Sequence, residues 1–366
     1  MQGQPNTQVA VVGGGVVGAA TTLALARRGV SVTLLEARDR LGLGASGTNS
    51  GILHTGFDSP PGELETRMIL RSAELRDPVL ERLGIPVRRC GALLRPRTDA
   101  DRATVEGLAR DGLAELDEQG VLRVPGEAVT DPVAYTRALA NAAEAKVMTG
   151  ARVEAVERSG DEFSLGLASG DRVRCRVVVN CAGLYADEVA RLAGDDSLAI
   201  YPRKGEFFVF EPPDGTPLER ILLPVPTKRT KGVLVFPTLD GKVVAGPTAH
   251  DQEDKEDWSV REEAWGEVMP KAAAMLPSLE GAEPIAAYAG LRPAGRDGLN
   301  YAIAASRACP GLVNVGAIRS TGLTASLGIA EHVVGLVAEQ GVRLSPEQEL
   351  ATARAEPSEG PWWRHS

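Results

Sequence analysis

The stretch QVAVVGGGVVGAATTLALARRGVSVTLLEA near the amino terminus constrains the fold more than any other part of the chain. It predicts a β-α-β unit that consists of an apolar strand at 9–12, a glycine turn, a helix over about 17–28 and a second strand at 30–35. The glycines at the turn have the spacing G-x-G-x-x-G, and Glu36 follows the second strand. A lone glycine triplet often marks a plain turn, but here every neighbouring element agrees, so we interpret the unit as a dinucleotide-binding site.

Each residue type in this unit has a physical task. Gly13 permits the tight turn, Gly15 lets the backbone approach a pyrophosphate, and Gly18 allows the helix to pack closely on the strand. The first helical N–H groups and the positive end of the helix dipole attract the phosphates, and Glu36 can accept hydrogen bonds from the adenosine ribose hydroxyls. The cofactor contacts that we predict in this unit are Gly13, Gly15, Val16, Val17, Gly18, Glu36, Ala37 and Arg38.

Two later segments repeat the plan of a strand that ends in a small-residue turn before a helix. In RVRCRVVVNCAGLYADEVARLAG, a strand at 177–180 turns at Ala182 and Gly183. In GLVNVGAIRSTGLTASLGIAEHVVGLV, a strand at 312–315 precedes a helix from about Thr324. A nicotinamide dehydrogenase would continue with further βαβ repeats, whereas three separated strand-to-helix turns fit a larger cofactor. The pattern therefore favours FAD over NAD.

In their order and spacing, these motifs resemble the flavoprotein oxidoreductases of the D-amino-acid oxidase superfamily, and within them the branch of glycerol-3-phosphate oxidases or dehydrogenases and L-2-hydroxyglutarate oxidases. The resemblance extends from Val9 to about Val337 and also rests on GASGTNSGILHTGFDSPPGEL, VLVFPTLDGKVVAGPTAHDQEDKED, YAGLRPAGRDGLNYAI and STGLTASLGIAEHVV. It implies an α/β (α+β) fold in which a Rossmann-like domain binds FAD and the antiparallel sheet of a second, substrate domain covers the flavin. Since GLRPAGRDGLNY lacks a cysteine, we expect the FAD to be bound non-covalently.

A chain of 366 residues is long enough for two domains. From the resemblance, we expect a discontinuous FAD-binding domain made of 1–88, 145–202 and 286–350, and a substrate domain made of 89–144 and 203–285. Short strand-like runs bounded by proline and glycine, with Asp240 and Gly241 in a hairpin position, agree with an antiparallel sheet. In the irregular tail, 351–366, we expect Trp362 and Trp363 to dock on the surface rather than form a cofactor site.

The resemblance places a second FAD contact and a proton acceptor in GASGTNSGILHTG. Small side chains let the backbone reach the cofactor, and the contacts implied here are Gly44, Ala45, Ser46, Asn49, Ser50 and Gly51. His54 follows them. In glycerol-3-phosphate oxidases a histidine at this position lies beside the flavin, so His54 is our candidate for the base that takes the hydroxyl proton. The alternative is a histidine that only hydrogen-bonds the loop or the flavin.

Arg292 is the first candidate for binding the anionic group of a substrate, because a guanidinium binds carboxylate or phosphate bidentately; a surface arginine beside a proline turn is the alternative. Lys231 is a second candidate for binding this anionic group; the alternative is a charge that contacts only solvent. Ser320, at the turn before the last helix, is a candidate for contact with the substrate or the flavin. Arg319 and Thr321 depart from the residues common in the family, which suggests extra positive charge near the pocket. The remaining cofactor contacts that we expect are Val153, Ala182, Gly183, Arg292, Thr321, Gly322, Leu323 and Thr324.

These residues predict an FAD-dependent oxidase or dehydrogenase that moves a hydride from the C–H beside a hydroxyl to flavin N5. The substrate would be a small anionic 2-hydroxy acid such as L-2-hydroxyglutarate, or glycerol-3-phosphate, and oxygen or another acceptor would reoxidise the flavin. Two alternatives stay open: an amine or amino-acid oxidase of the glycine, sarcosine or D-amino-acid type, and a flavin-binding protein without turnover. Apart from GLGASG at 42–47, which lies in the stretch assigned to FAD, the sequence has no second G-x-G-x-x-G for NADPH, and this disfavours monooxygenation.

Charge and composition exclude other classes of protein. The net charge of −9 argues against nucleic acid as a partner, and the four scattered cysteines form no C-x-x-C pair, so we expect no metal site. No window reaches the roughly 18 apolar residues of a membrane span, and the amino terminus lacks the pattern of a cleavable signal. We therefore expect a cytoplasmic protein, whose oligomeric state stays open.

Overall fold

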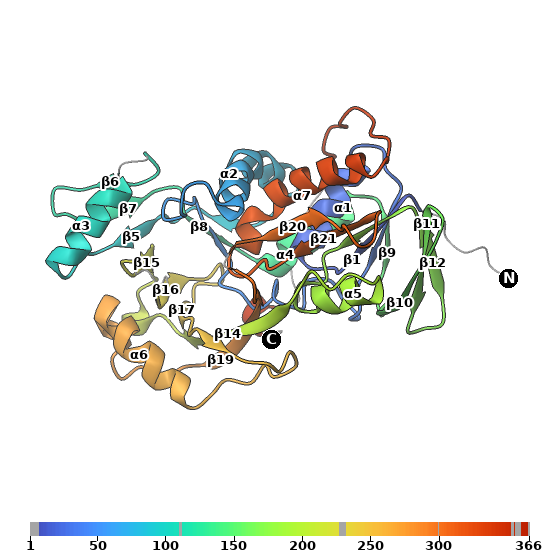
Figure 1. The fold of residues 1–366 in the computed structure, drawn as a ribbon. Helices are drawn as coiled ribbons and strands as arrows, with labels where there is room; N and C mark the ends of the chain where they lie inside the picture. Colours follow the sequence, from blue (N-terminus) through green and yellow to red (C-terminus); the bar gives the residue numbers. More distant parts are fainter. Residues whose placement is uncertain are drawn as a thin grey trace.

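The computed structural model describes residues 7–109, 112–226, 232–298, 300–352, 355 and 360–364. A six-stranded sheet, on the right in Figure 1, contains the amino-terminal β-α-β unit. Its strands, in spatial order, are β20 (Ala302–Ala305), β21 (Leu312–Gly316), β13 (Val177–Asn180), β1 (Val9–Val12), β2 (Val32–Leu35) and β9 (Lys146–Met148). Strand β20 is antiparallel to β21, and the other neighbours are parallel. The sheet is thus Rossmann-like, as predicted.

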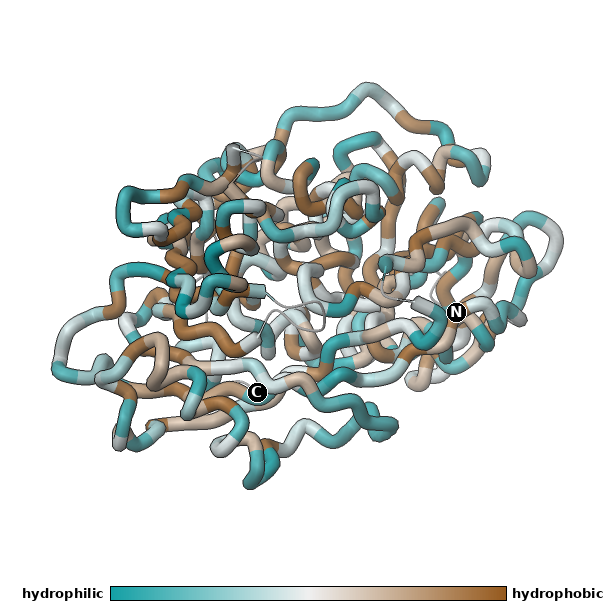
Figure 2. Tube along the Cα trace, turned by 60° about the vertical axis from the view of Figure 1, so that its left-hand side comes forward, coloured by the Kyte–Doolittle hydropathy of each residue, from teal (hydrophilic) through white to brown (hydrophobic). Residues whose placement is uncertain are grey.

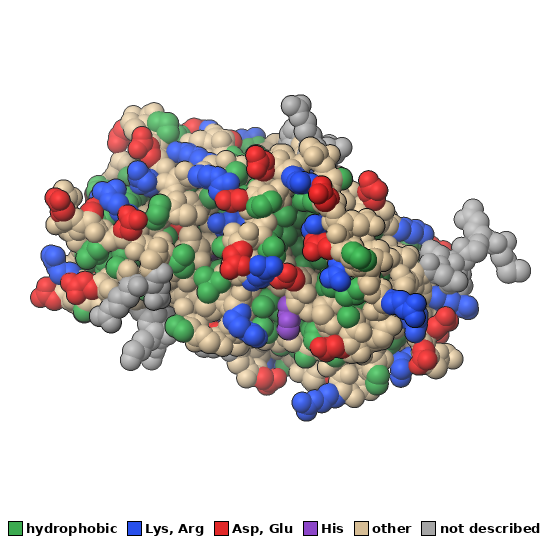
Figure 3. Space-filling view, turned by 90° about the horizontal axis from the view of Figure 1, so that it is seen from above, with side chains coloured by type: hydrophobic (Ala, Val, Ile, Leu, Met, Phe, Trp, Pro, Cys, Tyr) green, Lys and Arg blue, Asp and Glu red, His purple; other side chains and the backbone are tan. Residues whose placement is uncertain are grey.

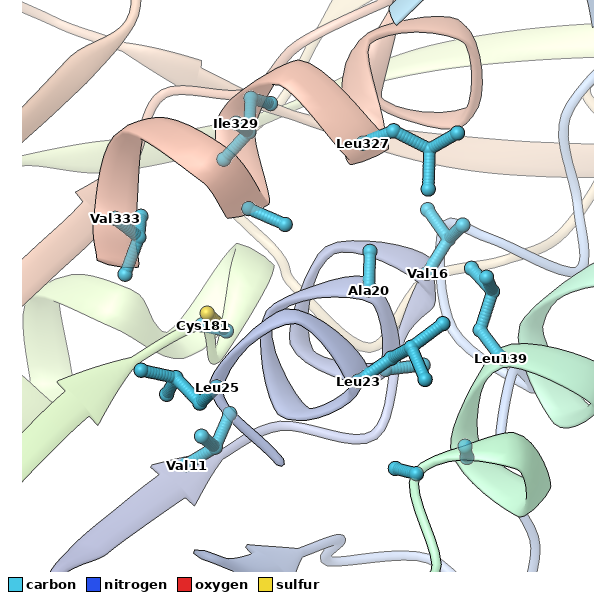
Figure 4. Packing of buried hydrophobic residues seen from close by; sticks show 14 of the residues in the cluster. Val11, Val16, Ala20, Leu23, Leu25, Leu139, Cys181, Leu327, Ile329 and Val333 are labelled. Atoms are coloured by element: carbon cyan, nitrogen blue, oxygen red, sulfur yellow. The ribbon is translucent and has the colours of Figure 1, made fainter. Parts of the chain in front are cut away.

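Alternation of side chains in β1 explains why this strand is a continuous apolar run. Val9 and Val11 face the helices on one side of the sheet, whereas Ala10 and Val12 face the strands on the other side, so both faces are buried. Helices α1 (Val16–Ala26) and α7 (Gly322–Glu339) pack on each other over the first face, with α4 (Pro132–Ala142) against α1 and α2 (Leu64–Arg82) against α7. Figure 4 shows apolar side chains of α1 between those of α7 and α4.

A smaller three-stranded antiparallel sheet covers the opposite face. It consists of β10 (Val153–Ser159), β11 (Glu162–Leu167) and β12 (Arg172–Cys175). The side chains of Phe163, Leu165 and Val173 from this sheet belong to the same apolar cluster as Ala10 and Val12 of β1. Helix α5 (Ala186–Leu192) follows β13 and packs against β10 and β21.

The element ends differ from the predicted ones by a few residues. Helix α1 ends at Ala26 because the backbone N–H groups of Gly29 and Val30 bond back to the carbonyls of Ala26 and Leu25. Gly29 has a φ of +73°, the left-handed conformation that commonly ends a helix. The second strand therefore begins at Val32 rather than at residue 30, and α7 begins at Gly322, before Thr324.

A nine-stranded sheet forms the second layer of the molecule; all its described strand pairs are antiparallel, as predicted, except one parallel pair. Its longest strands, β14 (Ile200–Phe210) and β19 (Ala286–Gly295), pair along their length, from Ile200 opposite Gly295 to Val209 opposite Ala286. The other strands are β5 (Ala92–Leu94), β6 (Glu115–Leu116), β7 (Leu122–Val124), β15 (Ile221–Leu223), β16 (Leu234–Pro237), β17 (Val243–Gly246) and β18 (His250–Asp251). Helix α6 (Glu263–Met275) packs on β16 and β17, and α3 (Asp99–Leu108) lies beside β5 and β7 (Figure 1).

A fourth, small sheet joins the two layers. It has the order β3 (Ile52–Leu53), β8 (Ala128–Thr130) and β4 (Val87–Arg88). Strand β3 is antiparallel to β8, with Leu53 opposite Ala128, so the residues that immediately follow β3 meet those that immediately precede β8. Short 3-10 helices η2 (Gly183–Tyr185), η3 (Pro213–Gly215), η4 (Pro277–Leu279) and η5 (Trp362–Arg364) complete the described elements.

The two tail tryptophans lie deeper than predicted. Trp362 and Trp363 in η5 are only 4% and 2% exposed, and they belong to the apolar cluster of the nine-stranded sheet. Trp362 meets Tyr288 of β19 edge to face, with ring centroids 5.5 Å apart. The expectation that both rings dock on the surface is wrong, because the two rings pack among apolar side chains of the sheet.

Strand β14 extends across the predicted domain boundary at 202, and it pairs along its length with β19, which begins at the predicted boundary at 286 and lies within the segment assigned to the FAD-binding domain. The division into domains therefore stays a prediction.

Apolar segments, brown in Figure 2, run through the inner strands and helices, and acidic and basic side chains are interspersed on the face in Figure 3. No helix among the described residues is long and apolar enough to cross a membrane.

Candidate active site

A cavity of about 1150 Å³ lies between the carboxyl ends of β1 and β2 and the strands β14 and β19. It exceeds the roughly 300–1,000 Å³ of ordinary small-molecule sites, which leaves room for a dinucleotide and a substrate. It brings together residues from all three predicted strand-to-helix turns. The predicted residues that line it are Gly13, Gly15, Val16, Val17, Glu36, Ala37, Arg38, Gly44, Ala45, Ser46, Asn49, Ser50, His54, Val153, Ala182, Gly183, Arg292, Ser320, Thr321, Gly322 and Leu323.

Three predicted cofactor contacts lie behind this lining. A Cβ on Gly18 would stand 1.9 Å from the carbonyl oxygen of Gly13, which is the close helix packing expected of the third glycine. Gly51 has a φ of +66° and approaches the backbone of β8, and Thr324 accepts a hydrogen bond from the backbone N–H of His54, 3.0 Å away. These residues support the lining rather than form it.

Lys231, the second candidate for anion binding, lies outside the described residues.

The turn after β1 has the geometry that a pyrophosphate site needs. Gly13 has a φ of +108°, and a Cβ there would stand 2.3 Å from the carbonyl oxygen of Cys181, so only glycine fits. Helix α1 follows with Gly15 as its N-cap and without a side-chain cap. One early helical N–H, that of Val16, is bonded to the hydroxyl of Ser46 at 2.9 Å. The positive end of α1 therefore faces the cavity and favours an anion there.

Glu36 is held at the end of β2, on the cavity wall. One carboxylate oxygen accepts a hydrogen bond from the N–H of Gly14 at 2.7 Å, and the other accepts one from the N–H of Arg38 at 2.8 Å. The carboxylate is thereby fixed at the edge of the glycine turn, where the adenosine ribose of a bound dinucleotide is expected.

The loop before β3 forms another wall. The side-chain amide of Asn49 donates to the carbonyl of Ser46 at 2.7 Å, and its oxygen accepts from the N–H of Gly51 at 2.6 Å, so the loop is braced from within. Gly290 of β19 lies so close that a Cβ there would stand 2.3 Å from the carbonyl oxygen of Thr48. The loop and the roof strand therefore enclose the cavity together.

His54 is paired with Glu127, a residue that the sequence analysis missed. Nδ1 of His54 lies 2.8 Å from one carboxylate oxygen of Glu127, and the histidine and glutamate side chains are 16% and 0% exposed. The other carboxylate oxygen accepts from the N–H and the hydroxyl of Thr55, at 2.7 and 3.1 Å. The pairing follows from the register of β3 on β8, which places the residue after Leu53 opposite the residue before Ala128.

This pairing defines what the imidazole can do. A carboxylate only accepts hydrogen bonds, so Nδ1 of His54 must carry a proton, and a neutral ring then keeps its lone pair on Nε2. The backbone is held too, because Arg76, whose pKa is lowered by burial, donates to the carbonyl of His54 at 3.1 Å. His54 lines the cavity, so an acceptor for a substrate proton is available there.

Arg292 lies on β19 on the cavity wall, rather than at the surface beside a turn. Its guanidinium donates to the backbone carbonyls of Arg203, Lys204 and Thr248 at 2.8–3.0 Å. Burial, and then the neighbouring charge of Arg203, lower the pKa of Arg292 to about 10, so the side chain is still a cation at neutral pH. No hydrogen bond joins its Nη1 to another described residue, so a partly buried positive charge with one donor that the described residues do not use is available for an anion.

The positive charge expected from Arg319 is partly cancelled. Its guanidinium pairs with the carboxylate of Glu65 on α2 at 3.2 Å, and the hydroxyl of Thr321 donates to the same carboxylate at 2.6 Å. Nε of Arg319 is buried without an acceptor among the described residues, and the side chain lines the cavity. The two residues that depart from the family pattern are therefore bound together through Glu65.

Cys181 is the one cysteine among the described cavity-lining residues, and burial raises its pKa to about 12. Its thiol is therefore protonated and unreactive at neutral pH, in keeping with a non-covalent cofactor. No group of histidine, cysteine and acidic side chains among the described residues could hold a metal ion.

Known proteins resemble the chain along most of its length. The model of a family described as FAD dependent oxidoreductase matches residues 8–336. A glycerol 3-phosphate dehydrogenase of Caloramator mitchellensis is 28% identical over 352 residues, which cover 90% of this chain and 73% of that protein. A mitochondrial L-2-hydroxyglutarate dehydrogenase of Mus musculus is 29% identical over 277 residues, which cover 65% and 60%. The FAD-bound, dithionite-reduced L-alpha-glycerophosphate oxidase of Mycoplasma pneumoniae aligns with a TM-score of 0.88 at 27% identity, over 97% of this chain and 100% of that one.

Proposed function

Since the chain belongs to the family of FAD-dependent oxidoreductases, we propose that it oxidises the hydroxyl-bearing carbon of glycerol-3-phosphate or of a small 2-hydroxy acid such as L-2-hydroxyglutarate. The protein is an enzyme of the D-amino-acid oxidase type, and its cofactor is FAD. The names of the similar proteins support these two substrates, and the first is favoured because the glycerophosphate oxidase aligns over nearly the whole chain.

The observation that carries the proposal is that His54, which is paired with Glu127 behind it, lines the same cavity as Arg292. Arg292 would bind the phosphate or carboxylate of the substrate through its free donor. Nε2 of His54 would accept the hydroxyl proton, and the buried carboxylate of Glu127 would stabilise the imidazolium that forms. FAD supplies the acceptor for the hydride that leaves the same carbon.

We assign the FAD contacts to the turns described above. The amino end of α1, with Gly13 and Gly15, would hold the pyrophosphate, and Glu36 the adenosine ribose. The loop 44–50 and the amino end of α7, at Thr321 and Gly322, would hold the rest of the cofactor, since both line the cavity without a large side chain. Val153, Ala182 and Gly183 complete the wall.

Turnover with product identification tests the proposal. The purified enzyme is supplied with oxygen or with an artificial electron acceptor, and the keto product of each hydroxy compound is measured; glycine, sarcosine and D-amino acids serve as comparison substrates. We expect a keto product from glycerol-3-phosphate or a 2-hydroxy acid, and the faster of the two acceptors separates an oxidase from a dehydrogenase. Release of ammonia or an amine instead would replace the proposal with amine oxidation. The cytoplasmic location stays a prediction.

A further inference from the structure

The segment between β18 and α6 approaches the cofactor end of the cavity. Glu256 and Trp258 from this segment line the cavity together with Arg38. The guanidinium of Arg38 lies over the indole ring of Trp258, 5.4 Å from the ring centroid. Since the backbone of Arg38 is bonded to the carboxylate of Glu36, Trp258 lies near the group that we assign to the ribose.

On one side, the segment is fastened to the layer that contains the β-α-β unit. Nζ of Lys255 lies 2.8 Å from the carboxylate of Asp187 and 2.7 Å from that of Glu188, both on α5. The hydroxyl of Tyr185 in η2 donates to the carboxylate of Glu256. Two neighbouring residues of the segment thus bond to the turn and helix that follow β13.

On the other side, the segment is fastened to the nine-stranded sheet. The ammonium of Lys204, a fully buried residue of β14, donates to the carboxylate of Asp257 at 2.7 Å, and this bond, together with those from Ser259, lowers the pKa of Asp257 to about 2. Arg261 pairs with the buried carboxylate of Glu206 at 2.7 Å. The segment therefore bridges the two layers across the cavity wall.

The indole of Trp258 has a donor that the protein does not use. Its Nε1 is buried, and none of the described residues accepts a hydrogen bond from it. A buried N–H without an acceptor costs stability, so folded proteins nearly always provide one, and the side chain that carries this N–H lines the cavity. An oxygen-rich ligand in that cavity would satisfy the donor.

We propose that residues 252–258 form a clasp over the AMP half of FAD, and that the indole N–H of Trp258 donates a hydrogen bond to a ribose or phosphate oxygen there. The clasp rests on the FAD site of the proposed function and is independent of the substrate. It slows release of FAD, because the cofactor leaves only after the contacts of Lys255 and Glu256 with the opposite layer open.

Trp258→Phe tests the hydrogen bond, because it removes the N–H and keeps an aromatic ring beside Arg38. The dissociation constant of FAD is measured by adding FAD to the apoprotein and following the quenching of flavin fluorescence. We expect binding to weaken roughly 2- to 10-fold, the effect of losing one neutral hydrogen bond. Trp265→Phe is the matched control, since Trp265 lies half-exposed on α6 and contacts Phe208, and it should bind FAD as the wild type does.

The unfolding temperature of the apoprotein separates cofactor binding from folding. We expect Trp258→Phe not to lower it, because the N–H that is removed has no acceptor among the described residues. Lys255→Met keeps the indole and breaks the bonds to α5, so FAD should leave faster from it than from the wild type. The proposal is overturned if Trp258→Phe binds and releases FAD like Trp265→Phe, or if it lowers the stability of the apoprotein and leaves FAD affinity unchanged.

Discussion

Replacing Glu127 by glutamine removes one charge from the candidate site and also reverses a hydrogen bond. In the structure, Glu127 accepts from the N–H of Thr55 on one side and from Nδ1 of His54 on the other. A glutamine side chain has one acceptor atom, its amide oxygen, and one donor group, its NH₂. Because the backbone N–H of Thr55 can only donate, the amide oxygen must face Thr55, and the NH₂ group then faces Nδ1 of His54.

This orientation forces the wrong tautomer on the imidazole. Nδ1 of His54 would have to accept, so the proton would move to Nε2, and the base would lose the lone pair that it needs. Loss of a general base typically costs a factor of 10²–10⁴, and an asparagine in the analogous position of a serine protease triad costs about 10⁴. We therefore expect flavin reduction in Glu127→Gln to slow by roughly 10²–10⁴-fold, or about 3–5 kcal/mol of barrier.

Stopped-flow reduction of the bound flavin under anaerobic conditions measures this rate directly. The visible spectrum of the variant should show that FAD is still bound, because Glu127 is not among the residues that line the cavity. Glu280→Gln, the same change at an exposed position, is the matched control and should reduce its flavin at the wild-type rate. A wild-type rate in Glu127→Gln would refute the argument that Glu127 sets the tautomer of His54.

Three further predictions follow from the same geometry. His54→Ala should retain FAD and slow flavin reduction by roughly 10²–10⁴-fold, and an unchanged rate would remove His54 from the mechanism. Arg292→Ala should raise the dissociation constant of the substrate. In the wild type, KM should rise above pH 10, since Arg292, with a pKa of about 10, is charged below that pH and neutral above it. A KM that does not change up to pH 11 in a still folded enzyme would contradict the anion contact. Trp362→Ala should lower the free energy of unfolding by roughly 3–5 kcal/mol, the usual cost of deleting a buried aromatic ring, and chemical denaturation with no change in midpoint would show that the tail is dispensable.

The sequence predicted the parts of the fold that depend on neighbouring residues. The positive φ of Gly13, the strand β1 with two apolar faces and the acid at Glu36 are local features, and the structure has them where the pattern indicated. Helix and strand ends shifted by a few residues, because hydrogen bonds such as that of Val30 to Leu25 are not visible in a periodicity.

Contacts between distant segments were the part that sequence reasoning missed. Glu127 lies 73 residues from His54 and meets it only through the register of β3 on β8. The one available signal was an acid inside the apolar run VPGEAV, which indicates a buried carboxylate with a function. In the same way, Glu65 neutralises part of the charge of Arg319 from a helix that precedes it by more than 200 residues.

The most direct test of the central claim is an anaerobic titration of the purified enzyme, followed through the visible absorption of its flavin. The titrants are glycerol-3-phosphate, L-2-hydroxyglutarate, lactate, glycine, sarcosine and a D-amino acid. We predict that glycerol-3-phosphate or a 2-hydroxy acid bleaches the flavin band and that the amines leave it unchanged. A flavin band that only an amine bleaches, or that none of the titrants bleaches, would contradict the proposed oxidation of an anionic hydroxy compound.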